Sequence, residues 1–162
     1  MLRISRGLRC YRSVKVGDTA SVRRRFTAAE VKQFASLCGD ANPIHVDPTA
    51  ARLAGFRNAI VHGILVSSLF SNLMGSELPG PQSIYVSQSL EFKAPVYVDD
   101  EVEARVTVEG FNAKRGWIWL KTTVTKDDGT LCVVGRSIGK NKVVSFVGES
   151  VDSLPSPSQQ PK

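Results

Sequence analysis

The chain has 162 residues, a length that suits one domain with a substantial buried core. Hydrophobic residues make up 42% of it, which excludes a wholly disordered chain. The longest apolar stretch, 60–74, is interrupted by polar residues and is too short to span a membrane, so we expect no membrane partner. The three cysteines are odd in number and lack metal-ligand spacing, which excludes a disulfide framework and suits a reducing compartment.

The net charge of +6 is concentrated at the N-terminus. Residues 1–17 carry five basic side chains and no acidic one, whereas residues 18–162 hold 16 basic and 15 acidic side chains and contribute only +1. An Arg-rich, acid-free leader is typical of a mitochondrial transit peptide, and Tyr11 precedes a suitable cleavage point. The sequence therefore predicts a leader at 1–17 and a location in the mitochondrial matrix. A solvated basic tail or a nucleic-acid-binding arm is the alternative.

The first half of the chain predicts an extended segment at 19–26. Short helices are predicted to follow at 28–38, 48–54 and 62–74. Thr27 and Glu30 form a capping box that begins the first helix, and Gly39 ends it. Residues 40–47 are expected to be a loop that Pro43 holds rigid.

The helix expected at 62–74 is unusual because its apolar residues point in every direction. A helix that is apolar all round is a buried helix, so something must wrap it. Gly75 and the Pro-Gly-Pro run that follows end this helix.

Beyond Pro81 the pattern changes to alternation and β-branched runs, which predict strands at 83–92, 100–109, 117–126, 130–137 and 138–146. Residues 127–129, Asp-Asp-Gly, form a hairpin turn. One buried helix before four or five antiparallel strands predicts an α+β domain over 18–147, with the sheet curled around the helix. Residues 148–162 lack core-forming side chains and are expected to be a disordered Pro/Ser-rich tail.

Side chains suited to proton transfer lie close together at residues 39–45. Asp40 and His45 are five residues apart around Pro43, which keeps Asn42 extended and makes the turn rigid. We therefore expect Asp40 and His45 to point into one small volume, where they hold a water molecule as a catalytic acid–base pair. The alternative is a loop in which Asp40 and Asn42 bond nearby backbone groups while His45 is only packed.

Gly63 lies where the buried helix begins, so its N–H is unpaired and the helix dipole adds positive potential there. Such a donor can stabilise a developing enolate oxygen, although a glycine at a helix entrance also permits close packing. Ser71, about two turns further along, is expected to brace Asp40 through a hydrogen bond, unless it bonds only its own helix. His62 is assigned a capping or packing role outside the chemistry.

Several other kinds of site are disfavoured by the sequence. No G-x-S-x-G motif is present, and Ser67 and Ser68 lie within the buried helix, so a serine hydrolase is a poor fit. Nucleotide-binding glycine motifs are also missing, so we expect no cofactor. Asp40, His45 and His62 could surround zinc or iron, but they lack metal-site spacing and we expect no metal.

Two further features receive structural interpretations. The basic run at residues 23–25 is short and is not interleaved with aromatic residues, so it indicates a solvated strand end, and we expect no nucleic-acid partner. Cys38 lies two residues before Asp40 and could be a nucleophile. Because free cysteines are usually small core residues, we interpret Cys38 as a buried structural thiol.

The motifs around these residues resemble those of the MaoC-like (R)-specific enoyl-thioester hydratases, the hydratase 2 group of the hot-dog superfamily. They are Gly39-Asp40-x-Asn42-Pro43-Ile44-His45, Ile60-Val61-His62-Gly63-Ile64-Leu65, Ser83-Ile84-Tyr85 and Glu91-Phe92-Lys93-Ala94-Pro95-Val96. The resemblance covers residues 14–145. A single short domain behind an Arg-rich leader looks like the mitochondrial 3-hydroxyacyl-thioester dehydratases of type 2 within this group.

The resemblance implies a hot-dog fold, with Asp40 and His45 as the catalytic pair and the Gly63 N–H as the oxyanion donor. It also implies that Asn42 orients the site and that Ser71 supports Asp40. The implied reaction is the reversible dehydration of (3R)-3-hydroxyacyl thioesters, carried on acyl carrier protein or CoA, to trans-2-enoyl thioesters. Family members work without a cofactor as homodimers whose second subunit completes the acyl tunnel. A hot-dog acyl-thioesterase and a non-catalytic RNA- or acyl-carrier-binding module are the alternatives.

Overall fold

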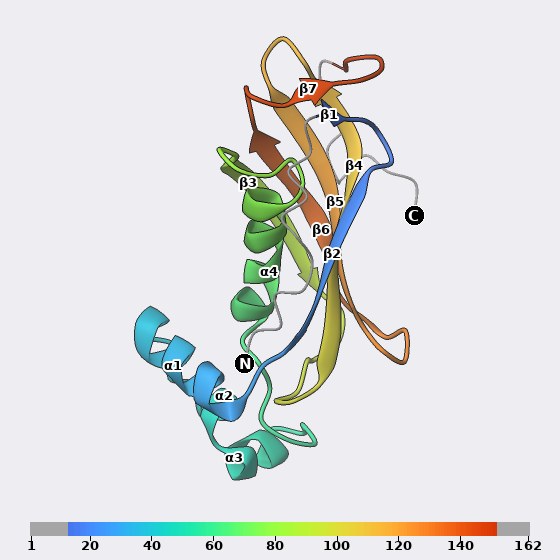
Figure 1. Cartoon of the computed structure of the whole chain (residues 1–162). Helices are drawn as coiled ribbons and strands as arrows, with labels where there is room; N and C mark the ends of the chain where they lie inside the picture. Colours follow the sequence, from blue (N-terminus) through green and yellow to red (C-terminus); the bar gives the residue numbers. More distant parts are fainter. Residues whose placement is uncertain (1–12, 152–162) are drawn as a thin grey trace.

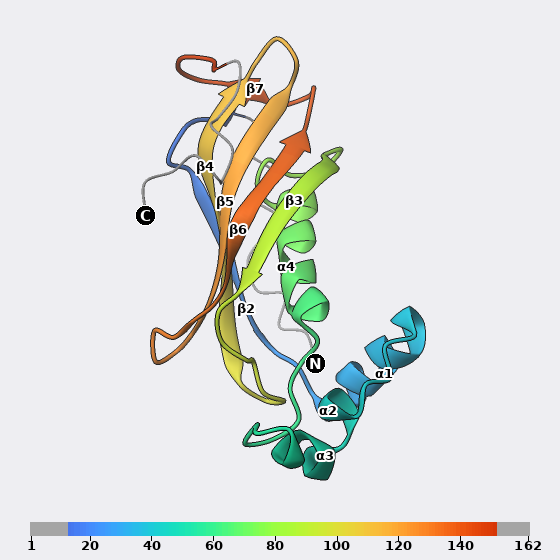
Figure 2. The same ribbon diagram turned by 180° about the vertical axis from the view of Figure 1, so that it is seen from behind.

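A five-stranded antiparallel sheet packs against one long helix in the computed structural model, which describes residues 13–151 (Figure 1). The sheet has the order β2-β4-β5-β6-β3. Its strands are β2 (Thr19–Arg25), β3 (Ile84–Phe92), β4 (Glu101–Asn112), β5 (Trp117–Lys126) and β6 (Leu131–Lys140). The helix is α4 (Gly63–Ser76), and β3 forms the sheet edge beside it (Figure 2). This arrangement confirms the predicted α+β hot-dog fold.

Three short helices lie together beyond one end of the sheet (Figure 1): α1 (Ala28–Cys38), α2 (Pro43–Val46) and α3 (Pro48–Leu53). The bounds of α1 agree with the prediction, because both capping-box bonds of Thr27 and Glu30 are present and Gly39 has a φ of 80°. The expected loop at 40–47 is wrong in part, because it contains α2. Asn42 begins α2 by accepting a hydrogen bond from the Ile44 N–H, and proline stands in its first turn.

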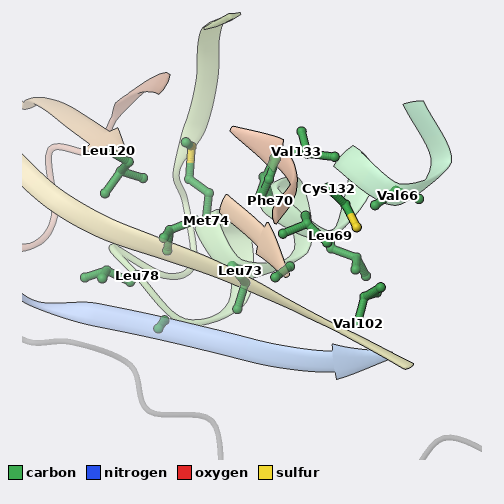
Figure 3. Packing of buried hydrophobic residues seen from close by; sticks show 14 of the residues in the cluster. Val66, Leu69, Phe70, Leu73, Met74, Leu78, Val102, Leu120, Cys132 and Val133 are labelled. Atoms are coloured by element: carbon green, nitrogen blue, oxygen red, sulfur yellow. The ribbon is translucent and has the colours of Figure 1, made fainter. Parts of the chain in front are cut away.

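The core lies between α4 and the face of the sheet turned toward it (Figure 3). The buried residues of α4 include Val66, Leu69, Phe70, Leu73 and Met74, and they pack with sheet residues such as Val102, Leu120 and Val133. Full burial of a Leu or Phe side chain contributes about 2 kcal/mol, so this layer supplies much of the driving force for folding.

Within one chain, α4 is not covered on all sides. One stripe of the helix is exposed, and it comprises Ile64, Ser68, Ser71, Asn72 and Gly75. Ile64 is 61% exposed despite its large apolar side chain. The sheet covers one side of α4 and leaves the opposite side open. One chain therefore buries only part of the apolar surface of this helix.

The two strands expected at 130–137 and 138–146 are in fact one strand, β6, followed by the short strand β7 (Ser145–Phe146). The break comes at Asn141, whose side chain bonds the backbone groups that follow it. Its Oδ1 accepts hydrogen bonds from the N–H groups of Val143 and Val144, and its Nδ2 donates to Pro81 O. β4 also runs beyond its expected end at 109, through an irregularity between Val108 and Gly110.

Both ends of the described chain extend the domain beyond 18–147. β1 (Ser13–Val14) pairs in parallel with β7, and Val14 is fully buried. At the other end, the Val151 N–H donates to Phe111 O. The remainder of the predicted leader and tail, residues 1–12 and 152–162, lies outside the described residues. No helix within 13–151 has the length and apolar character needed to cross a membrane.

Candidate active site

The turn between α1 and α2 fixes the carboxylate of Asp40. Gly39 turns the chain through a left-handed conformation, and Asp40 Oδ1 then accepts a hydrogen bond of 3.2 Å from the Asn42 N–H. This short-range bond occupies one carboxylate oxygen and leaves Oδ2 for other contacts. The Asp40 side chain is 54% exposed.

His45, on α2, faces this free oxygen. Its Nδ1 lies 2.8 Å from the carbonyl oxygen of Ile60, and because a carbonyl can only accept, Nδ1 carries the proton. In the neutral ring Nε2 is then the basic nitrogen, and it lies 3.8 Å from Asp40 Oδ2. The Ile60 carbonyl is itself held in place, since the Ile60 N–H donates to Ile44 O. Asp40 and His45 are therefore brought together as the sequence predicts.

The structure adds His62, which sequence reasoning left outside the chemistry. Its Nε2 lies 3.0 Å from Asp40 O and so donates to it, and its ring stacks on that of His45 with centroids 3.8 Å apart. The ring of Phe34 packs against the His62 ring in a T-shaped arrangement, with the two ring centroids 5.1 Å apart. His62 begins α4 without making a side-chain cap. A signal was available, because the chain has only two histidines and both fall in the quoted motifs.

Gly63 is the first residue of α4, so its N–H lacks the acceptor that residues deeper in the helix have. A side chain here would collide with Phe92, because a Cβ built on Gly63 lies 2.5 Å from Phe92 Cε1. The glycine therefore permits the aromatic ring to approach the backbone closely. Both residues line a cavity of about 350 Å³ together with His45, Phe56, Ile64 and Val133. The cavity wall is mostly apolar, which suits an acyl chain.

Asn42 and Ser71 occupy different positions relative to this site. Asn42 supports it indirectly, because it begins the helix that carries His45. Ser71 lies eight residues beyond Gly63, about 12 Å along α4, on the exposed stripe. Within the part of the chain that the structure describes, no hydrogen bond joins Ser71 to Asp40, so one chain does not bring these two residues together.

Cys38 differs from its predicted state. The thiol was expected to be buried, but Cys38 is exposed. It lies on the last residue of α1, where its Sγ accepts a hydrogen bond of 3.4 Å from the Asp40 N–H. The buried face of α1 instead carries Ala35 and Val31, about one and two turns before Cys38.

Asp40, His45 and His62 also offer three donor atoms within 4.8 Å of one another, which raises the possibility of a metal ion. His45 fits such a role, since its Nδ1–H bond to a carbonyl is typical of a ligating histidine. His62 does not fit, because its Nε2 already donates to Asp40 O. Binding a metal there would move the proton to Nδ1, which is buried without a partner among residues 13–151. The donor set suits proton transfer better than a metal.

A helix packed on one face of an antiparallel sheet, with Asp40 and His45 beside the start of that helix, is the arrangement of a hot-dog protein. The MaoC like domain family matches residues 13–130, more than half of the chain, so this protein belongs to that family. Over 128 residues it is 46% identical to the (R)-specific enoyl-CoA hydratase of Aeromonas caviae, a match that covers 79% of this chain and 96% of that protein. It is 47% identical over 89 residues to a mitochondrial 3-hydroxyacyl-[acyl-carrier-protein] dehydratase of Arabidopsis thaliana, which covers 55% of this chain and 52% of that protein.

Solved structures agree with the fold. The (R)-hydratase from Aeromonas caviae gives a TM-score of 0.76 at 46% identity, covering 78% of this chain and 96% of that chain. An R-hydratase from Pseudomonas aeruginosa in the unliganded form gives 0.74 at 27% identity, covering 91% of this chain and 94% of that chain.

Proposed function

We propose that this protein catalyses the reversible dehydration of (3R)-3-hydroxyacyl thioesters to trans-2-enoyl thioesters. The observation that carries this proposal is the separation of 3.8 Å between Asp40 Oδ2 and the basic nitrogen of His45, beside an apolar cavity that Gly63 lines. The family membership and the names of the hydratase and dehydratase relatives support the same reaction.

The geometry suits the addition of water across a conjugated double bond. Asp40 and His45 hold the water, and one of them accepts its proton as the oxygen bonds to C3. The electron pair of the double bond moves toward C2 and the thioester oxygen, where the Gly63 N–H and the start of α4 stabilise the negative charge. The pair then delivers to C2 the proton taken from the water, so both side chains end in their starting protonation states. Dehydration reverses these steps, so atoms and charge balance without a cofactor.

A homodimer is part of the proposal. β3 lies at an edge of the sheet, and three of its large apolar residues are exposed: Ile84 by 61%, Val86 by 43% and Phe92 by 53%. An exposed apolar edge strand favours pairing with a second copy. Such pairing would also cover the exposed stripe of α4 and close the Phe92 side of the cavity. Because Ser71 lies on that stripe, its proposed support of Asp40 depends on the dimer.

We further propose that the protein works in the mitochondrial matrix on acyl groups held by acyl carrier protein. The Arg-rich leader and the mitochondrial dehydratases of Arabidopsis thaliana and tomato support this location. Cleavage after Tyr11 would remove most of the basic residues of the leader and leave β1 intact. A reporter fused to residues 1–17 tests the address, and a diffuse cytosolic signal would contradict it.

The reaction is tested with crotonyl-CoA. Hydration removes the absorbance of the conjugated enoyl thioester and releases no thiol. Thiol release would instead identify an acyl-thioesterase. A complete lack of turnover by the wild-type protein on both CoA and carrier-protein substrates would favour a binding module. Comparing the two carriers at several chain lengths then assigns the natural substrate.

A further inference from the structure

We infer that His62 is a positioning residue that holds both members of the catalytic pair in place, an inference that rests on the proposed function. His62 reaches Asp40 through a hydrogen bond and His45 through ring stacking. It belongs to a different element from either of them, because it begins α4 whereas the pair lies around α2. The residue thus connects the α1–α2 turn to the body of the domain.

The contact with Asp40 fixes the backbone rather than the carboxylate. The carbonyl of Asp40 accepts from His62 Nε2 at 3.0 Å, and the carboxylate Oδ2 lies 4.0 Å from the same nitrogen. Besides this bond, the Asp40 N–H makes a weak hydrogen bond of 3.4 Å to Cys38 sulfur, and the Ala41 N–H donates to Gly39 O at 3.1 Å. Because the Asp40 side chain is half exposed, packing against other residues does not hold it in place. The hydrogen bond from His62 fixes the Asp40 backbone instead, and with it the direction of the side chain.

The contact with His45 fixes the plane of the catalytic ring. The two imidazoles lie 3.8 Å apart with an angle of 24° between their planes. The Nδ1–H bond to the Ile60 carbonyl holds one edge of the His45 ring, but a single bond still permits the ring to tilt. The face of His62 prevents that tilt, so Nε2 stays directed toward Asp40 Oδ2. Small displacements of catalytic groups reduce rates steeply.

His62 occupies its position at a cost in stability. Its side chain is 3% exposed and meets Phe34, yet its Nδ1 has no hydrogen-bond partner in the described part of the chain. A buried polar atom without a partner is destabilising, and a phenylalanine would fill this space without one. A residue that lowers the stability of the fold is expected at a position where function requires it.

Two substitutions separate the contacts. His62→Phe keeps an aromatic face against His45 but loses the donor to Asp40, whereas His62→Gln keeps an amide donor but loses the ring. We expect each to lower kcat for crotonyl-CoA hydration about tenfold with KM within about twofold of wild type. His62→Ala removes both contacts and should lower kcat about a hundredfold. His62→Phe should have a Tm equal to or above that of the wild type, which shows that the lost activity is not lost folding.

Thr122→Val is the matched control. Thr122 is fully buried on β5 and, like His62, has a polar atom without a partner in the region 13–151, but it is not part of the cavity wall. The control should keep the wild-type kcat. Full kcat in folded His62→Phe would overturn the role of the hydrogen bond, and full kcat in His62→Gln would overturn the role of stacking. An inactive wild-type protein would instead overturn the proposed function, so the two failures are distinguishable.

Discussion

Replacement of Gly63 by alanine tests the oxyanion position with a single methyl group. The new Cβ would lie 2.5 Å from Phe92 Cε1 and 2.9 Å from Cδ1 and Cζ, whereas ordinary contacts begin at 3.4 Å. The ring must therefore retreat by about 0.9 Å, the difference between 3.4 and 2.5 Å. Phe92 is 53% exposed, so it can do this by moving outward at little cost.

Stability and activity should respond differently to this change. Alanine favours a helix over glycine by up to about 1 kcal/mol, which offsets the loss of Phe92 packing, so we expect Tm to stay within about 4 °C of wild type. The methyl group blocks the approach of the thioester oxygen to the Gly63 N–H. Loss of one oxyanion donor lowers kcat by about 100-fold or more, and we expect that reduction in kcat/KM for crotonyl-CoA.

A double substitution distinguishes the two possible causes of the loss. Phe92→Ala removes the ring that collides, so Gly63→Ala in that background leaves only the blocked amide. We expect the double variant to remain about 100-fold below Phe92→Ala alone. If the double variant instead matches Phe92→Ala, the loss comes from the displaced ring and the oxyanion assignment of Gly63 is refuted. Wild-type kcat/KM in Gly63→Ala itself would refute it as well.

Three further predictions concern the acid–base pair, an ion pair and the sheet edge. Asp40→Asn and His45→Ala should each lower kcat by about 10²–10⁴ with little change in Tm, and a loss under tenfold would contradict their roles. Burial opposes ionisation of Asp100, but the hydrogen bonds from Lys126 and the Tyr97 N–H, together with the charges of Lys126 and Arg57, outweigh it and lower the pKa of the Asp100 carboxyl. A depressed folded-state pKa stabilises the fold above the unfolded-state value, so Asp100→Asn should reduce the unfolding free energy by about 2 kcal/mol at pH 7. Denaturant titrations should show that difference shrinking as pH falls below about 4, and a constant difference would contradict the charge effect. Val86→Lys should convert the dimer to a monomer in sedimentation experiments and reduce turnover, whereas an unchanged dimer would exclude the β3 edge as the interface.

Elements with local signals are predicted well from the sequence. The bounds of α1 agree because its capping box and terminal glycine lie within thirteen residues of one another. β5 agrees because Gly116 precedes it and the turn at 127–129 follows it. The proximity of Asp40 and His45 is predicted for the same reason, since one short turn joins them.

Features that depend on distant residues are predicted poorly. The end of β6 depends on Asn141 reaching Ser83, which is 58 residues away in sequence. The role of His62 depends on the fold bringing the start of α4 to the carbonyl of Asp40, 22 residues earlier. The exposed stripe of α4 cannot be predicted from the sequence for another reason. An apolar residue such as Ile64 contributes in the same way to the sequence pattern whether it packs on the sheet of its own chain or on a second copy.

The pairing of β1 with β7 determines how the domain responds to a pull on its N-terminal end. A pull on the N-terminal end acts first on β1. This two-residue strand pairs with β7, the last strand of the fold. The next strand is β2, which lies at the sheet edge and pairs with β4. Edge strands pulled in sequence peel away one at a time, whereas a central strand would resist as a unit. The topology thus places two edge pairings, and no central strand, at the N-terminal end of the described domain.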